Sequence, residues 1–348
     1  MLEKSIRWKL WLAAGLTALV APASGCIYGD TVRVSETRRL MGVPWTITLH
    51  AASEAAGREA AAAAFAEVER LAGILSDYDE GSELSRLSAA APTAAPVAVS
   101  DDLWRVLERS LAIRDATGGG FDPTVGPLTT LWRQSRRSGE LPRPEKLAAA
   151  RAAVGPENLV LDRDRRTVKL LAPGMRLDLG GIGMGYAIDR ALEVLRKRGI
   201  TAAMIDASGD VGVSGPPPGS TGWRIEVAPL DPTAADEPRQ TLWLVNAAVT
   251  TSGDARQGVE IDGIRYSHIV DPRTGIGVLG PAAVTVIAAD CTTADALATA
   301  ASVLGPEEGL RAVESEPRAA ARFVWFEAGA PREARSSRWP AQPSQPAE

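Results

Sequence analysis

The chain has 348 residues and a formal net charge of −5, so it can form one large domain or two small ones around a sizeable core. Its basic residues form no long run. Nucleic-acid binding draws on clustered lysine and arginine, so the composition disfavours nucleic acid as a partner. It leaves small anionic ligands open, because local dipoles or a metal ion can hold them.

The first 26 residues predict an export signal. Basic residues precede an apolar run, Leu10–Val20, that is too short to span a bilayer comfortably. Small residues then precede Cys26, which resembles a bacterial lipobox with Ala23 where a larger aliphatic residue is usual. We expect lipidation of Cys26 and a membrane-anchored protein facing the periplasm or the cell exterior. The alternative is ordinary cleavage that leaves a free thiol.

Cysteine usage fits this expectation. If Cys26 carries lipid, only Cys291 remains and no internal disulfide is possible. Cys291 has no metal-ligand spacing with His50 or His268. We expect it to be a small buried apolar residue rather than a nucleophile.

Residues 27–40 are expected to form a tether. An alternating strand at 41–51 and an alanine-rich amphipathic helix at 54–75 should follow. The polar stretch 75–88 predicts a plain turn with the start of a short helix, or else a loop whose Tyr78 stacks on a ring.

Ser100, followed by two aspartates, predicts the N-cap of a helix that runs to about Thr117. Glycines and prolines around Asp122 predict irregular backbone over 121–132, and long loops are often functional. A polar, exposed segment should come next. Beyond it we expect a short helix at 147–153 and paired strands at 158–162 and 167–171.

A glycine-rich turn is the second informative stretch. A predicted strand, 176–179, runs into Gly180–Gly185, which opens a helix closed by Gly199. Such glycines let backbone amides approach a phosphate at the positive end of a helix. The spacing is not that of a dinucleotide-binding fingerprint, so a tight strand-to-helix turn is an equal alternative.

The remaining chain reads as mostly strands. An Asp262–Gly263 pair between two strand-like runs predicts a β-hairpin. Residues 331–348 are rich in proline and serine and are expected to be a disordered tail. Further strands are expected at 201–205, at 223–230, within 241–257 and at 321–327. Another short strand should end at residue 214.

Two oxygen-bearing residues share a helix face near the C-terminus. Asp295 and Thr299 are four residues apart and therefore lie one above the other. A carboxylate and a hydroxyl are hard ligands that suit Mg²⁺ or Ca²⁺. The alternative is structural, because Thr292-x-x-Asp295 also has the spacing of a helix capping box.

His268 lies at the end of a predicted strand, followed by a turn with Asp271, Arg273 and Thr274. A lone histidine is usually a hydrogen-bonded structural residue. The density of polar groups in this one strand–turn unit makes it a candidate site nonetheless.

Seven segments in this order carry a resemblance to a known family: MGVPWTITL, SDYDEGSELSRLS, GGGFDPTVGPLTTLW, LDLGGIGMGYAIDRA, TTSGDARQ, YSHIVDPRTG and TTADALATA. Together they resemble the ApbE family of bacterial FAD:protein FMN transferases, which are often exported lipoproteins. The match runs from about Gly42 to Gly305.

The resemblance implies an α+β fold over residues 41–330, with mixed sheets, packed helices and a flavin cleft between two parts. It implies Mg²⁺-dependent transfer of FMN from FAD to a threonine or serine of an acceptor protein, with a phosphoester formed and AMP released. Phosphoryl transfer of this kind needs positioning and charge neutralisation more than covalent chemistry. The expected partners are that acceptor, a membrane redox subunit or a periplasmic flavoprotein, and the membrane itself through the lipid.

The resemblance also assigns residues. The metal would be held by the side chains of Asp295 and Thr299 and by carbonyls near Gly183 and Ala298. His268, Asp271 and Asp295 would be catalytic. The implied flavin-nucleotide contacts are Met41, Tyr78, Asp122, Gly180, Gly181, Met184, Asp189, Asp210, Thr251, Ser252, Gly253 and His268.

One departure from the family pattern matters most. Met184 stands where the family turn G-G-x-x-K-G-Y has lysine, which removes a cation that would sit near phosphates. An alternative function follows: a lipoprotein that binds or hydrolyses FAD with weak or no transfer. A third possible function is that of a surface lipoprotein that binds a different ligand. This function would require that FAD does not bind.

Overall fold

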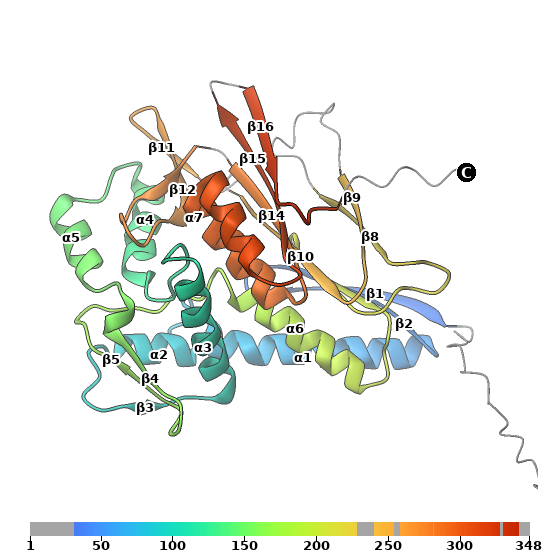
Figure 1. Cartoon of the computed structure of the whole chain (residues 1–348). Coiled ribbons are helices and arrows are strands. Elements are labelled where there is room, and N and C mark those ends of the chain that lie inside the picture. Colours follow the sequence, from blue (N-terminus) through green and yellow to red (C-terminus); the bar gives the residue numbers. More distant parts are fainter. Residues whose placement is uncertain (1–30, 228–239, 254–257, 281, 328–329, 341–348) are drawn as a thin grey trace, which may run out of the picture.

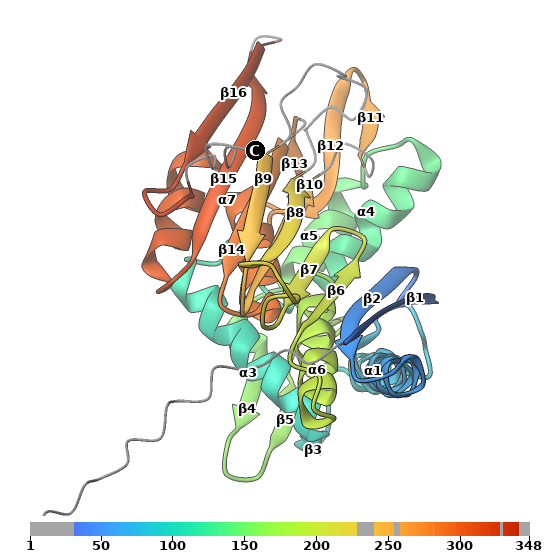
Figure 2. The ribbon, with the colours of Figure 1, turned by 90° about the vertical axis from the view of Figure 1, so that its right-hand side faces the viewer.

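The structure is a computed structural model that describes residues 31–227, 240–253, 258–280, 282–327 and 330–340. An antiparallel eight-stranded sheet runs through it in the order β1-β2-β6-β7-β10-β14-β15-β16 (Figures 1 and 2). In chain order its strands are β1 Val32–Leu40, β2 Val43–Ala51, β6 Ala203–Ala207, β7 Asp210–Val213, β10 Ala247–Gly253, β14 Ala282–Ala288, β15 Ala320–Glu327 and β16 Ala330–Arg335.

Three helices build the main core on this sheet: α1 (Glu54–Leu75), α6 (Gly183–Lys197) and α7 (Cys291–Ser315). α6 packs between the other two (Figure 1). Successive side chains along a strand point to opposite faces of the sheet. Ala248 of β10 faces the helices, whereas Val249 faces the small hairpin of β8 (Trp223–Val227) and β9 (Gln240–Leu244).

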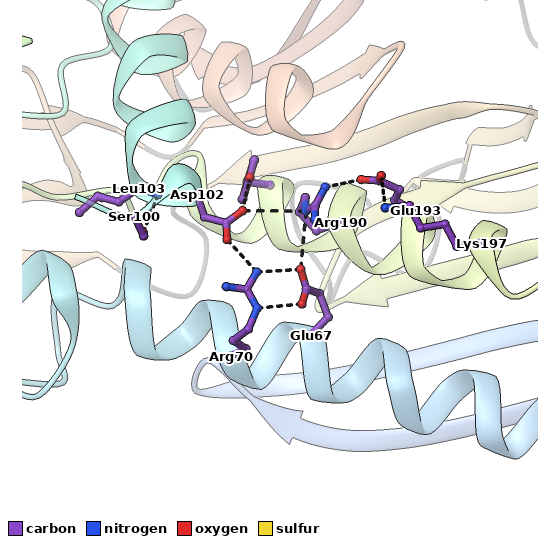
Figure 3. A network of polar contacts seen from close by, with 9 residues as sticks. Glu67, Arg70, Ser100, Asp102, Leu103, Arg190, Glu193 and Lys197 are labelled. Carbon is purple, nitrogen blue, oxygen red and sulfur yellow. Dashed lines mark hydrogen bonds and ion pairs between the residues drawn. The ribbon is translucent and has the colours of Figure 1, made fainter. Parts of the chain in front are cut away.

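An ion-pair network joins α1 and α6 to α3 (Asp101–Ala116), as Figure 3 shows. Arg70 binds Glu67 through two hydrogen bonds of 2.8 and 2.9 Å and reaches Asp102 at 2.7 Å. Arg190 of α6 approaches the same Glu67 at 3.6 Å. Because several charges share partners, the network stabilises this helix arrangement better than isolated surface pairs would.

The rest of the chain forms a flank beside the core, on the left in Figure 1. Its helices are α2 (Glu83–Ala89), α4 (Gly126–Ser138), α5 (Pro144–Ala152) and the short 3₁₀ turn η1 (Pro156–Asn158). One sheet has the order β3-β5-β4 and the other β11-β12-β13. Their strands are β3 Val97–Ala98, β4 Leu159–Asp162, β5 Thr167–Leu170, β11 Val259–Ile261, β12 Ile264–Val270 and β13 Gly277–Leu279.

Helix α4 is fixed to β12 by one aromatic residue. The ring of Trp132 lies 5.0 Å from that of Tyr266. The indole N–H of Trp132 donates a 2.8 Å hydrogen bond to the carbonyl of Gly275. A buried indole with its N–H satisfied holds the two elements in one orientation.

Most predicted elements are confirmed, including the helix over 54–75, the helix after Ser100 and the Asp262–Gly263 hairpin. Cys291 is buried as expected. Several antiparallel sheets and packed helices confirm the α+β class. Among the described helices, none has the length and apolar character needed to cross a membrane.

The described fold extends past both predicted ends of the domain, residues 41 and 330. The expected tether contains β1, which pairs with β2 along its whole length, and Val34 lies so close to α1 that a Cβ on Gly57 would meet it at 2.6 Å. The expected tail contains the end of β16. Both are edge strands of the sheet, ordered by backbone pairing rather than by apolar side chains. The signal segment 1–26 and residues 341–348 lie outside the described residues.

Two internal expectations also need correction. The irregular stretch over 121–132 ends early, because α4 begins at Gly126 with Pro127 in its first turn, where proline is well tolerated. Residues 176–179 form no strand.

Candidate metal and nucleotide site

Helix α6, with the glycine turn before it, runs antiparallel to α7, and the two contact each other every four residues. Asp189 accepts the backbone N–H of Cys291, Gly185 donates its N–H to Asp295, and Gly181 lies against Thr299. A Cβ on Gly181 would lie 2.6 Å from Thr299 Oγ1. The glycine turn therefore brings its backbone into contact with the two predicted metal ligands, as close approach requires.

Asp295 is a buried carboxylate with few partners. Its Oδ2 accepts the N–H of Gly185 at 3.1 Å, its only hydrogen bond within the described chain. Burial, and then the charge of Asp189, raise the pKa of this carboxyl well above its usual value. Burial and Asp295 likewise raise the pKa of Asp210. A buried charge short of hydrogen bonds is costly, and a bound cation would offset that cost.

Thr299 continues the same face of α7. Its Oγ1 lies 3.5 Å from the hydroxyl of Ser252 at the end of β10. The neighbouring Thr251 instead bonds Thr285 at 3.0 Å. The structure thus brings Ser252, Thr299 and Gly181 together, whereas the side chain of Thr251 serves the sheet.

The two predicted carbonyl ligands both belong to helices. The carbonyl of Ala298 accepts the hydroxyl of Ser302 at 2.9 Å, besides the bond expected of a helical carbonyl. Gly183 is the first residue of α6, and a Cβ there would meet nothing closer than 3.8 Å. The metal-binding roles of both carbonyls stay predictions.

The donor set fits a hard cation. Asp295 and Thr299 supply a carboxylate and a hydroxyl, and Gly183 offers a carbonyl. Within the described ranges, no group of three histidine, cysteine or acidic side chains could hold a metal ion. A site with one carboxylate suits Mg²⁺, which keeps waters and takes further oxygens from a substrate phosphate.

The capping-box interpretation of Asp295 is wrong. The N-cap of α7 is Asp290, whose side chain accepts the N–H of Thr293 at 2.8 Å. Asp189 also serves this helix end, because it accepts the backbone N–H groups of Cys291 and Thr292, each at 2.8 Å. These contacts give Asp189 a structural role, and its predicted nucleotide contact stays a prediction.

A second polar cluster adjoins the glycine turn. Arg133 of α4 bonds Asp77 at 2.6 Å and Asp178 at 3.1 Å, and its guanidinium carbon lies 4.2 Å from the ring centre of Tyr78. Asp178 in turn accepts the N–H of Gly180 at 2.8 Å. Tyr78 is 74% exposed, so its free ring face is available for stacking.

His268 lies beside this cluster on β12. Its Nδ1 is buried and has no hydrogen-bond partner within the described residues. Burial, and then the positive charge of Arg136, lower the pKa of His268 to about 4. The imidazole is therefore neutral at pH 7 and able to accept a proton.

Three other predicted residues have local partners. Asp271 holds its own turn through Arg273, at 3.0 and 3.1 Å. Asp122 accepts both the N–H and the hydroxyl of Thr124 and pairs with Arg114 at 3.0 Å. Met41 forms the turn between β1 and β2 with φ at 48°. These contacts explain local structure, and the nucleotide roles of these residues stay predictions.

Met184 and Gly253 complete the predicted set. Met184 lies half-buried against the main core at the start of α6. Gly253 ends β10, next to Ser252.

Asp77, Arg133 and Asp178 were not predicted. Asp178 had a usable signal, since it lies two residues before the first glycine of the turn in LDLGG. Arg133 had none, because it belongs to a segment that its polarity marks as exposed.

A cavity of about 600 Å³ lies elsewhere, between α3, α6 and the N-terminal end of α7. Among the predicted site residues it includes only Asp189. The expected flavin cleft therefore stays a prediction.

The fold and the site define an α+β protein with a candidate hard-oxygen cation site beside a glycine turn. Comparison with known proteins agrees: the ApbE family model matches residues 41–323. An FAD:protein FMN transferase of Vibrio cholerae is 34% identical over 246 residues, covering 69% of this chain and 72% of that protein. One from Haemophilus influenzae is 31% identical over 245 residues, covering 69% and 71%.

Solved structures agree as well. The flavin transferase ApbE of Vibrio cholerae matches with a TM-score of 0.77 at 29% identity, over 88% of this chain and 98% of that one. The apo flavinyl transferase ApbE of Pseudomonas stutzeri gives a TM-score of 0.78 at 29% identity, over 89% and 96%. The chain belongs to the ApbE family, and the resemblance is confirmed.

Proposed function

We propose that this protein is a Mg²⁺-dependent FAD:protein FMN transferase. It joins FMN to a threonine or serine of an acceptor protein through a phosphoester and releases AMP. The names of its relatives support the reaction class. The observation that carries the proposal is the contact of Gly181 and Gly185 with Thr299 and the under-bonded carboxylate of Asp295.

Asp295, Thr299 and the carbonyl of Gly183 would hold Mg²⁺, which neutralises charge on the substrate phosphates when bound. The exposed ring of Tyr78 stacks on the flavin. His268 accepts the proton of the acceptor hydroxyl as that oxygen bonds to the FMN phosphorus and AMP leaves. For His268 the support is its neutral state and free Nδ1. A Vibrio cholerae ApbE variant with one histidine replaced by glycine has also been solved.

We also propose that the protein works outside the cytoplasmic membrane, anchored through lipid on Cys26. The support is the sequence signal alone. A Cys26→Ala variant released into the soluble fraction would agree with this, and one that stays in membranes would refute it.

The transferase proposal has a direct test. The purified chain is mixed with FAD, Mg²⁺ and acceptor domains, and flavin fluorescence of the denatured acceptor is measured together with released AMP. We expect both signals in equal amounts, and neither after chelation. AMP without a labelled acceptor would contradict transfer.

A second candidate, FAD hydrolysis without transfer, is favoured by one observation. Met184 brings no cation to the glycine turn, and Arg133 is balanced by Asp77 and Asp178. Met184→Lys separates the candidates. A variant that labels the acceptor faster than the natural chain would show that Met184 limits transfer, whereas equal labelling would remove the reason for this candidate.

A further inference from the structure

The segment that contains α4 and α5 is positively charged in an otherwise negative protein. Residues 126–151 hold six basic side chains against two acidic ones, a net charge of +4, whereas the whole chain carries −5. These six are Arg133, Arg136, Arg137, Arg143, Lys146 and Arg151. A local excess of one sign attracts ligands of the other, over about 10 Å at ordinary salt.

One face of α4 leads from the glycine turn to solvent. Thr129 bonds Asp178 at 2.7 Å, and Arg133 bonds the same carboxylate. Arg136 and Arg137 follow at helical spacing, so they continue this face toward the end of α4. Arg136 is half-buried and Arg137 is exposed.

The outer cations of α4 and the two basic residues at the start of α5 have no side-chain partners within the described chain. Within the described chain, the side chains of Arg136, Arg137, Arg143 and Lys146 form no hydrogen bond and no ion pair. Some exposed arginines elsewhere do pair: Arg163 binds Glu108 at 2.6 Å. We name Arg136, Arg137, Arg143 and Lys146 the α4–α5 basic surface.

We propose that the α4–α5 basic surface binds an acidic segment of the acceptor protein, next to the residue that receives FMN. The inference rests on the proposed function. Four free cations on two helices exceed what one pyrophosphate contacts, and the predicted phosphate site lies at the glycine turn, at the inner end of that face of α4. A carboxylate-rich chain extending outward from His268 matches their arrangement. Arg133 is not part of this surface, because its charge is already balanced.

The test uses two rhodamine-labelled peptides of about 12 residues, each with one threonine. In the first, aspartates and glutamates flank the threonine; in the second, the matching asparagines and glutamines do. Binding to the whole chain with FAD and Mg²⁺ is measured by anisotropy. We expect the acidic peptide to bind about tenfold tighter at low salt and to lose this advantage as salt rises.

The variant R137Q/R143Q/K146Q should weaken acidic-peptide binding about tenfold while the KM for FAD in AMP release stays unchanged. R105Q/R196Q is the matched control, since both arginines are exposed and have no side-chain partner among the described residues, but line the cavity near α3. It should bind the peptide normally.

Three results would overturn the inference: equal binding of both peptides, equal loss in the control variant, or a raised KM for FAD in the triple variant. A lower melting temperature with unchanged peptide binding would mean that these cations only stabilise the ends of α4 and α5. A chain that releases no AMP from FAD refutes the proposed function instead, and peptide binding reports on the surface separately.

Discussion

The two ends of the α6–α7 contact use the same kind of group in different ways. At one end Asp189 accepts the N–H groups of Cys291 and Thr292 and the hydroxyl of Thr292, at 2.8, 2.8 and 2.5 Å. At the other end Asp295 accepts one N–H, from Gly185, at 3.1 Å. Asp295 is buried and Asp189 is half-buried, and burial raises the pKa of each. The difference indicates that the protein itself completes the first end, whereas the second leaves a carboxylate for the proposed cation.

Replacing Asp295 should produce the largest effect. Asp295→Asn keeps an oxygen for Gly185 but removes the charge that would hold Mg²⁺, so we expect FAD turnover to fall on the order of 10²–10⁴-fold. AMP release per folded molecule measures this. Asp189→Asn should retain most activity at a temperature where it is folded. Similar activity losses in both variants would erase the distinction between the two ends.

For stability, replacing Asp189 should have the larger effect and replacing Asp295 the smaller one. Asp189→Ala leaves two buried N–H groups and a hydroxyl at the start of α7 without their acceptor, which should cost about 2–4 kcal/mol of unfolding free energy. Asp295→Asn should cost much less in the metal-free protein, or stabilise it, because it removes an under-bonded buried charge. Urea unfolding without metal gives both values, and a larger loss for Asp295→Asn would contradict this picture.

The glycine turn offers a matched pair of variants. Gly181→Ala places a Cβ 2.6 Å from Thr299 Oγ1, so we expect it to displace this hydroxyl and weaken Mg²⁺-dependent turnover about tenfold. Gly183→Ala meets nothing closer than 3.8 Å and should change turnover by less than about twofold. Titration of AMP release with Mg²⁺ distinguishes them. Equal Mg²⁺-dependent turnover in the two variants would show that close packing at Gly181 does not position the hydroxyl of Thr299.

The sequence predicted the features that depend on neighbouring residues, such as helix caps, apolar periodicity and the spacing of residues on one helix face. The helix Glu54–Leu75 has its cap, Ser53, and its apolar period in one stretch. Asp295 and Thr299 share a face through spacing alone. The cap of α7 was ambiguous locally, since Asp290 and Thr292 are both good capping residues. The choice depends on Asp189, which lies about a hundred residues earlier and already occupies the N–H groups of Cys291 and Thr292.

The missed features depend on distant partners. β1 exposes most of its side chains and buries only Val34, so its order comes from pairing with β2 rather than from its own pattern. The contact of Arg133 with Asp178 spans 45 positions. No spacing rule links such residues, and only the packing of α4 beside the glycine turn brings them together.

His268 is a third group in this comparison and, like Asp295, it is short of partners. Its replacement should have the smallest effect. Its folded pKa, about 4, lies below the ordinary 6.5, because of burial and of Arg136 and then Arg133 on α4, with Asp178 opposing. The unfolded chain therefore binds more protons between these values, and stability falls as pH drops through that window. We expect this residue to contribute a loss of about 1 kcal/mol between about pH 7.5 and 5.5.

His268→Gln should remove that part of the acid sensitivity, measured by urea unfolding at both pH values. Since His50 is the only other histidine in the sequence, imidazole NMR signals report the pKa of each directly. The pKa of His50 is also lowered, by burial and then by Arg33, and it serves as the internal reference. A His268 signal that titrates near 6.5 would mean that solvent reaches the imidazole. The burial that leaves Nδ1 without a partner would then be contradicted, while the contrast between Asp189 and Asp295 would stand.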